Sequence, residues 1–178
     1  MRRLRYQVAC SLDGYIADPN GGFDWIIPEP AFDFNALLAQ FDTLLMGRKT
    51  YETIIRSGVE LPDKRIIVAS RSFRQEDHPE AEIIHDRLKE RVHELLEQPG
   101  KDVWLYGGGE LLSQLLAWDL VDTVEPAIIP ILLGDGVPML AKNGVHRRLN
   151  FVRQQTYPRG MVLLEYEVQK ERDQRTEM

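Results

Sequence analysis

Residues 104–116 read WLYGGGELLSQLL, which joins an apolar run typical of a buried strand to a helix-like segment through three consecutive glycines. Glycine loses more conformational freedom on folding than any other residue, so three in a row at a structured junction need a reason. The dinucleotide fingerprint and the P-loop both fail, because each requires glycine where Leu112 stands. What remains is a strand, bare backbone and a helix start, whose free N–H groups favour an anion such as phosphate. A tight turn without any ligand is the alternative.

Two other apolar runs end in a similar way. TLLM at 43–46 is followed by Gly47-Arg48-Lys49-Thr50, and RIIVA at 65–69 is followed by Ser70-Arg71-Ser72. Cations at a helix start oppose the helix dipole, a conflict that a bound anion removes, while hydroxyls and a guanidinium suit phosphate. Solvated surface cations and a polar loop are the alternatives here. Because ligands of open α/β sheets bind beyond the carboxyl ends of the strands, we expect the three clusters to converge on one molecule.

Strand-like and helix-like segments alternate along most of the chain, which predicts an α/β fold. We expect a mainly parallel central sheet with helices on both faces and a C-terminal antiparallel hairpin at one edge. One domain should span 1–170, followed by a charged, frayed tail over 171–178. The expected strands are 4–10, 43–47, 65–70, 82–85, 102–106 and 121–129, the helices 34–41, 48–55, 88–96 and 110–117, and the hairpin 151–168.

Composition narrows the class of protein. The chain has 178 residues, of which 43% are hydrophobic and 28% charged, as in a soluble globular domain, and a net charge of −6 argues against nucleic acid as a partner. Cys10 is the only cysteine, so neither an internal disulfide nor a cysteine-rich zinc site is expected. The four histidines lack metal-ligand spacing, and we interpret them as surface residues. We expect a cytoplasmic protein with no metal, no signal peptide and no membrane partner.

The cofactor-specific residues favour NADP over NAD. No acidic residue follows Ala69 to bind a ribose 2′-hydroxyl, whereas Arg71 is placed to pair with a 2′-phosphate.

Five motifs in order cover nearly the whole chain: SLDGYIA at 11–17, LMGRKTYE at 45–52, VASR at 68–71, YGGG at 106–109 and PILLGDGVP at 130–138. Together they resemble the dihydrofolate-reductase-like superfamily, closest to stand-alone proteins related to the reductase domain of the bifunctional riboflavin-biosynthesis deaminase/reductase. The resemblance implies a dihydrofolate-reductase-like fold, NADPH as cofactor and a homodimer. Any role in riboflavin biosynthesis would be that of the reductase alone, since the deaminase's zinc site has no counterpart here.

The resemblance also implies roles for individual residues. Gly107 and Gly108 would form a cis peptide against the pyrophosphate, and Ala9 and Ile16 would flank the nicotinamide. Contacts to the phosphates would come from 48–50, and the 2′-phosphate end would be held by 70–71. The complete set expected at the cofactor is Ala9, Ile16, Gly47, Arg48, Lys49, Thr50, Ser70, Arg71, Tyr106, Gly107, Gly108, Gly109, Glu110 and Leu111.

Only single residues, and no contiguous motif, indicate where the substrate binds. Asp13, just past the first strand, is the candidate to deliver the proton that a reduction requires, or else a turn residue that bonds the backbone. Trp25 matches the pocket tryptophan of folate reductases, although it could equally belong to the core. Asp33 is the candidate substrate acid or the cap of the following helix, because the family's pterin-binding acid falls at Pro30. Glu125 could face the site or pair at an edge.

The sequence therefore predicts an NADPH-dependent reductase of a small heterocyclic or carbonyl substrate, resembling a pyrimidine or a pteridine. True dihydrofolate reduction is one alternative. A non-catalytic nucleotide-binding protein on the same fold is the other, because fold does not imply function.

Overall fold

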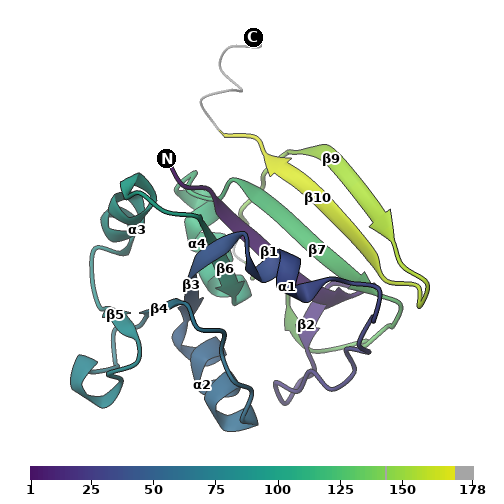
Figure 1. Ribbon diagram of the computed structural model, residues 1–178, viewed down its shortest axis with the longest axis horizontal. Helices are drawn as coiled ribbons and strands as arrows, with labels where there is room; N and C mark the ends of the chain where they lie inside the picture. The colour runs from purple at the N-terminus through teal and green to yellow at the C-terminus, as the bar shows by residue number, and fades with distance from the viewer. Residues whose placement is uncertain (143, 171–178) are drawn as a thin grey trace.

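The computed structural model describes residues 1–142 and 144–170, so the predicted tail over 171–178 lies outside the described residues. Its centre is an eight-stranded sheet with the order β5-β4-β3-β6-β1-β7-β10-β9 (Figure 1). The strands are β1 Leu4–Ser11, β2 Tyr15–Ala17, β3 Phe41–Gly47, β4 Arg65–Ala69, β5 Glu82–Ile84, β6 Asp102–Gly107, β7 Thr123–Ile129, β8 Val137–Pro138, β9 Leu149–Thr156 and β10 Val162–Val168. The helices are α1 Phe34–Leu38, α2 Arg48–Ser57, α3 Leu88–Glu97 and α4 Gly109–Ala117, with a 3-10 turn, η1, at Gln75–Asp77.

The strands from β5 to β7 run parallel to one another, and β10 is antiparallel to both of its neighbours, β7 and the edge strand β9. Sequential strands joined by helices produce this arrangement, because a parallel pair needs a crossover connection. The hairpin turns at 157–161, where the Tyr157 and Gly160 backbone groups bond each other. The predicted α/β fold with its antiparallel C-terminal pair is confirmed.

Helices cover both faces of the sheet, and each face has its own hydrophobic core. On one face α3 and α4 pack on the middle strands through residues such as Val92, Leu112 and Leu115. On the other face α1 and α2 pack around Trp104 and Phe41. Successive residues of a strand point to opposite faces, which is why neighbouring residues of β3 join different cores.

Two local predictions were wrong. The helix expected over 34–41 is the short α1, and Phe41 instead begins β3, where it is fully buried against Trp104 with ring centroids 5.1 Å apart. The sequence PILLGDGVPML at 130–140 also predicts a loop, because it is rich in glycine and proline, but its residues 137–138 form β8, which pairs antiparallel with β2. Neither β2 nor β8 has enough residues to show a period of two. Phe41 fits the helical spacing of Phe34, Leu37 and Leu38, although it is the first buried residue of β3.

A gap in the hydrogen-bonding pattern opens the sheet at its carboxyl end. The β1–β7 ladder runs to Ser11, whereas β1 and β6 pair only at Leu4 and Arg5. Beyond that point the Trp104 indole Nε1–H donates to the Gln7 carbonyl oxygen across 2.7 Å and bridges the two strands. Strands that part in the middle of a parallel sheet leave a crevice where ligands bind.

Among residues 1–142 and 144–170, no helix combines the length and the apolar character needed to cross a membrane.

Candidate functional site

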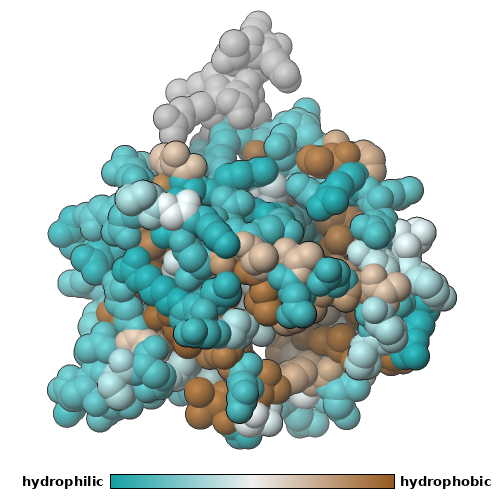
Figure 2. All heavy atoms as spheres, viewed as in Figure 1, coloured by the Kyte–Doolittle hydropathy of each residue, from teal (hydrophilic) through white to brown (hydrophobic). Residues whose placement is uncertain are grey.

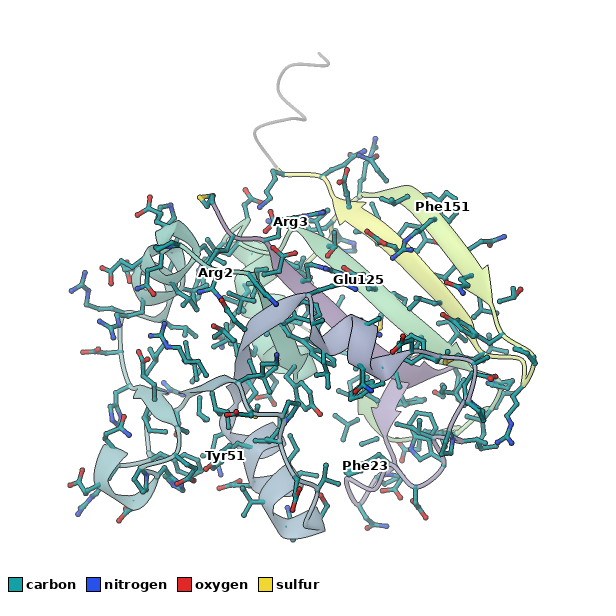
Figure 3. All side chains as sticks on the ribbon, in the orientation of Figure 1. Arg2, Arg3, Phe23, Tyr51, Glu125 and Phe151 are labelled. Carbon is teal, nitrogen blue, oxygen red and sulfur yellow. The ribbon has the colours of Figure 1, made fainter. Side chains whose placement is uncertain are left out.

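A cleft of about 1690 Å³ lies over the carboxyl ends of the central strands. Its walls come from β1, β3, β4 and β6, from the first turns of α2 and α4, and from the segment after β2. Figure 2 shows the hollow with hydrophobic residues inside it, and in Figure 3 α2 lies on one side of the opening while Phe23 lies on the other. A drug-sized ligand needs roughly 300–1,000 Å³, so this cleft has room for a cofactor together with a substrate.

The three consecutive glycines each have a different structural reason. Gly107 has φ +139°, a conformation that only glycine adopts readily, and its peptide bond to Gly108 is cis. A Cβ on Gly108 would lie 3.2 Å from Thr50 Oγ1, which is a tight contact beside the cleft. A Cβ on Gly109 would lie 2.6 Å from the Pro138 carbonyl oxygen. Gly109 is therefore required by the protein's own packing, whereas Gly108 keeps the space between α2 and α4 open.

Two helices begin beside each other at this place, and glycine is the N-cap of both. Gly47 precedes α2 and Gly108 precedes α4, so neither helix has a capping side chain. Their strands, β3 and β6, are hydrogen-bonded neighbours. The first N–H groups of a helix lack intrahelical partners, and two uncapped N-termini at one edge favour an anion between them.

The predicted phosphate-binding cations already have carboxylate partners. Arg48 Nη1 lies 2.8 Å from both Glu52 carboxylate oxygens, and Lys49 Nζ lies 2.9 Å from Glu110 Oε1. The Lys49–Glu110 pair joins the first turns of α2 and α4, and both side chains are 72% exposed. Exposed pairs of this kind contribute little free energy, so they can exchange readily for a bound anion.

The end of β4 provides the third predicted cluster. Ser70 is buried, and its Oγ accepts hydrogen bonds from the Ser72 and Phe73 N–H groups, so it shapes the loop. Arg71 is exposed and lines the cleft, and it makes no ion pair with any described residue. Three residues after β5, at 85–87, line the same end of the cleft. Sequence reasoning missed them, because a polar run after a three-residue strand looks like any loop.

Every residue expected at the cofactor lines this one cleft, including Ala9, Ile16 and Tyr106 at its inner end. Leu111 is buried at the start of α4, while Glu110 is exposed beside it. Burial raises the pKa of the Tyr106 hydroxyl, which therefore stays protonated at neutral pH.

The three residues expected on the substrate side do not line the cleft. Asp13 is exposed, and its carboxylate accepts from the N–H groups of Leu133 and Gly134 at 3.1 and 2.7 Å. These bonds, together with the Ser11 hydroxyl, which has the largest effect, lower its pKa to about 2. Asp33 caps α1 by accepting from the Ala36 N–H at 2.9 Å. Trp25 packs into a small core cluster and donates to the Gly22 carbonyl oxygen.

Glu125 neither faces the cleft nor pairs at an edge of the sheet, so both alternatives predicted for this residue are wrong. It is 3% exposed on the interior strand β7, and its two oxygens accept from Arg5 Nε and Nη2 at 2.7 Å each. The Thr123 hydroxyl donates to the same carboxylate at 2.6 Å. The Arg5 guanidinium lies over the Phe41 ring, and in Figure 3 Glu125 lies in the middle of the sheet near α1.

The inner end of the cleft is lined by mostly apolar residues that the sequence did not identify as candidates for the site. They share no motif, because they lie on five separate elements or loops and alternate with core residues. They are Gln7, Phe32, Phe34, Leu37, Trp104, Ala127 and Ile129.

Within the part of the chain that the structure describes, no three His, Cys, Asp or Glu side chains come together in a way that could hold a metal ion.

Comparisons with known proteins agree on one family. The family model described as the RibD C-terminal domain matches residues 2–163. The protein YyaP of Bacillus subtilis is 34% identical over 180 residues, which cover 93% of this chain and 94% of YyaP. A Shewanella sp. PV-4 structure, provisionally assigned to riboflavin biosynthesis, is 27% identical with a TM-score of 0.82, covering 96% of this chain and all of that one.

The fold extends to a more distant structure. The diaminohydroxyphosphoribosylaminopyrimidine deaminase/5-amino-6-(5-phosphoribosylamino)uracil reductase of Thermotoga maritima is 18% identical with a TM-score of 0.68. The match covers 94% of this chain and 57% of the Thermotoga chain. This likeness shows the shared dihydrofolate-reductase-like fold alone.

Proposed function

The chain belongs to the RibD C-terminal domain family, and from that premise we propose that it is an NADPH-dependent reductase of a small pyrimidine- or pteridine-like heterocycle. When bound, NADPH supplies the hydride. The protein's part is to hold the cofactor, orient the substrate against it and exclude water.

The pair of uncapped helix N-termini is the observation that carries the proposal. α2 and α4 begin at Gly47 and Gly108, and Thr50 Oγ1 adds a hydroxyl donor between them. Backbone N–H groups and helix dipoles stabilise negative charge, so the cofactor pyrophosphate fits between the two helices. Lys49 adds positive charge at the same place once the phosphate displaces Glu110.

The 2′-phosphate belongs at the end of β4 in this proposal. Arg71 lines the cleft there without an ion-pair partner among the described residues, and a guanidinium pairs with phosphate through two hydrogen bonds. No acidic residue of the β4 end competes for a ribose hydroxyl, which favours NADPH over NADH.

The inner end of the cleft is where the substrate fits. Trp104, Leu37 and Ile129 form apolar walls suited to the faces of a flat ring. The one acid of the 28–34 segment that lines the cleft is Glu29, and its oxygens accept from the N–H groups of Ala31 and Arg159. Folate is therefore not the substrate that we propose.

The test of cofactor binding uses Gly108→Ala, whose methyl group would stand beside Thr50 in the proposed pyrophosphate site. We expect a folded protein whose affinity for NADPH, measured by fluorescence titration, falls at least about tenfold. The control is Gly58→Ala at the other end of α2, where a Cβ meets no atom within 4 Å but the φ of +70° strains the backbone, so this variant should lose some stability and keep its NADPH affinity. Unchanged NADPH affinity in Gly108→Ala would contradict the proposal.

A second variant tests the choice of cofactor. Arg71→Ala should weaken NADPH binding about 10- to 100-fold and leave NADH binding nearly unchanged, because only NADPH carries the 2′-phosphate. Arg74→Ala is the control, since Arg74 is exposed three residues further on and does not line the cleft. Equal losses for the two cofactors would exclude the role of Arg71.

The proposal includes a homodimer formed through the C-terminal hairpin. All eight residues of the edge strand β9 are exposed, among them Leu149, Phe151 and Val152. Phe151 stacks edge-on against Tyr166 of β10 at 5.8 Å, which makes an aromatic patch on the outer strands (Figure 3). An open edge strand with apolar residues is suited to a second copy of the same hairpin. Light scattering should give the mass of a dimer for the native chain and of a monomer for Phe151→Glu; a monomeric native chain would overturn this part.

A further inference from the structure

Gln7 is a buried polar residue without a hydrogen-bond partner for its side chain. It lies in the middle of β1, is 7% exposed and lines the cleft. Its side-chain amide makes no hydrogen bond to any other described residue. The amide is not among the solvent-inaccessible polar atoms that lack a partner, so its N–H and C=O groups reach the cleft, where a ligand can bond them. The amide therefore points to a ligand that completes it.

On the face of β1 that carries Arg5, Gln7 and Ala9, the Gln7 amide is the one polar side-chain group without a hydrogen bond to a described residue. Arg5 uses Nε and Nη2 on Glu125 and Nη1 on Gln40 and Asp102, so each nitrogen of its guanidinium has a partner. Ala9, on the other side, has no polar side chain. The backbone of Gln7 is also fixed, because its carbonyl oxygen accepts the Trp104 indole N–H. Among these neighbours only the Gln7 amide remains available to a ligand.

The surroundings favour a flat, neutral ring over a charged group. Trp104 and Leu37 line the cleft here and are buried, and a charge would lose its hydration without gaining a partner. The Tyr106 ring packs on Trp104 with centroids 5.0 Å apart, and its hydroxyl has no partner among the described residues either. A primary amide offers one acceptor oxygen and two N–H donors side by side. That arrangement matches a ring edge with an adjacent C=O and N–H.

We propose that the Gln7 amide is the specificity-determining group of the substrate pocket, and that it recognises a lactam edge of the heterocycle through a pair of hydrogen bonds. The inference rests on the proposed function for the place of the substrate, and it adds the chemistry by which the substrate is selected. Sites built to hydrogen-bond a substrate reject analogues that lack the matching group much more strongly than apolar pockets reject a change of size.

The test compares two ring probes that differ in whether the ring nitrogens carry hydrogen or methyl, so that only one of them has a lactam edge. 5,6-Diaminouracil carries the ring N–H groups next to its carbonyls, whereas 1,3-dimethyl-5,6-diaminouracil has methyl groups in their place. Calorimetric titration of the native chain, with NADPH present, should give at least tenfold tighter binding of the first probe. Gln7→Met keeps the length of the side chain and removes the amide, so it should bind both probes equally.

The control variant is Gln40→Met, which removes a glutamine amide from the same region without touching the cleft lining. It should keep the native preference for the unmethylated probe. Thermal melting of both variants verifies that they fold. NADPH affinity, measured without any probe, should be the same in the native chain and in Gln7→Met.

The outcomes separate this inference from the proposed function. If the native chain binds NADPH but does not prefer the unmethylated probe, or binds neither probe, the proposed recognition of a lactam edge is wrong. Retained preference in Gln7→Met would overturn the role of Gln7 and leave the reductase proposal standing. Failure of the native chain to bind NADPH would count against the proposed function, whereas the preference between probes would still test Gln7.

Discussion

Between α2 and α4 the wall of the cleft is main chain, with glycine at both helix caps and few side chains. Under α1 the wall is made of side chains, Trp104 and Leu37 above all, supported by the buried Arg5–Glu125 pair. In our proposal the first half binds a charge that many cofactors share, and a Cβ at Gly108 or Gly109 would crowd it. The second half must fit one ring, so its properties depend on which side chains stand there. Our proposal therefore assigns specificity for the substrate to the side-chain half.

Breaking the support of the side-chain half should have the largest effect. Glu125→Gln leaves the Arg5 guanidinium buried without its two-point carboxylate, and we expect the free energy of unfolding to fall by about 3–5 kcal/mol. Urea denaturation measures it. The control is Glu165→Gln on the adjacent strand β10, where the partner Arg153 is 60% exposed and the loss should stay within about 1 kcal/mol. Equal losses in the two variants would show that the buried pair does not stabilise the fold.

The main-chain half separates into a ligand-facing part and a packing part, and Gly109→Ala tests that division. Its Cβ would lie 2.6 Å from the Pro138 carbonyl oxygen and 2.9 Å from that of Met139. Both are backbone atoms, so β8 must move, and the free energy of unfolding should fall by about 1–3 kcal/mol. Gly108→Ala, by contrast, should lose NADPH affinity with a smaller loss of stability. Urea denaturation and NADPH titration of both variants test this division. A larger loss of stability in Gly108→Ala together with a larger loss of NADPH affinity in Gly109→Ala would contradict it.

The same contrast explains what the sequence could predict. Each proposed cofactor cluster is a contiguous motif at the end of a buried strand, so the sequence alone predicted that Gly47, Arg71 and Gly107 would lie together, and all three line the cleft. The mainly parallel sheet and the C-terminal hairpin also follow from local alternation and crossover rules, whereas the order of the strands does not. The substrate half is assembled from single residues of separate elements. Gln7 is one polar residue within an ordinary strand, and only tertiary structure shows that its amide lacks a partner.

Asp13 marks the limit of reading a role from position alone. It follows β1 at the carboxyl end of the sheet, as a proton donor would, yet its carboxylate turns away to anchor the loop at 133–134. The residues of that loop are 120 positions away in the chain, so no local pattern distinguishes an anchor from a donor. Asp33 bonds only within its own helix start, whereas Trp25 packs behind the cleft, in the cluster that contains Ala127 and Ile129.

The smallest effect is expected for Asp13→Asn, which tests whether this carboxyl titrates near neutral pH. Its folded pKa of about 2 lies below the ordinary value of 3.8, so its stabilising effect is complete above about pH 4 and disappears as the pH falls toward 2. The difference in Tm between native and variant protein should therefore be small and the same at pH 5 and pH 8. It should shrink only in acid. The control is Asp135→Asn in the same loop, whose carboxylate bonds only the next residue's N–H. A Tm difference for Asp13→Asn that shrinks between pH 8 and pH 5 would mean that Asp13 takes up a proton there, and it would return this residue to the list of proton donors for the reduction.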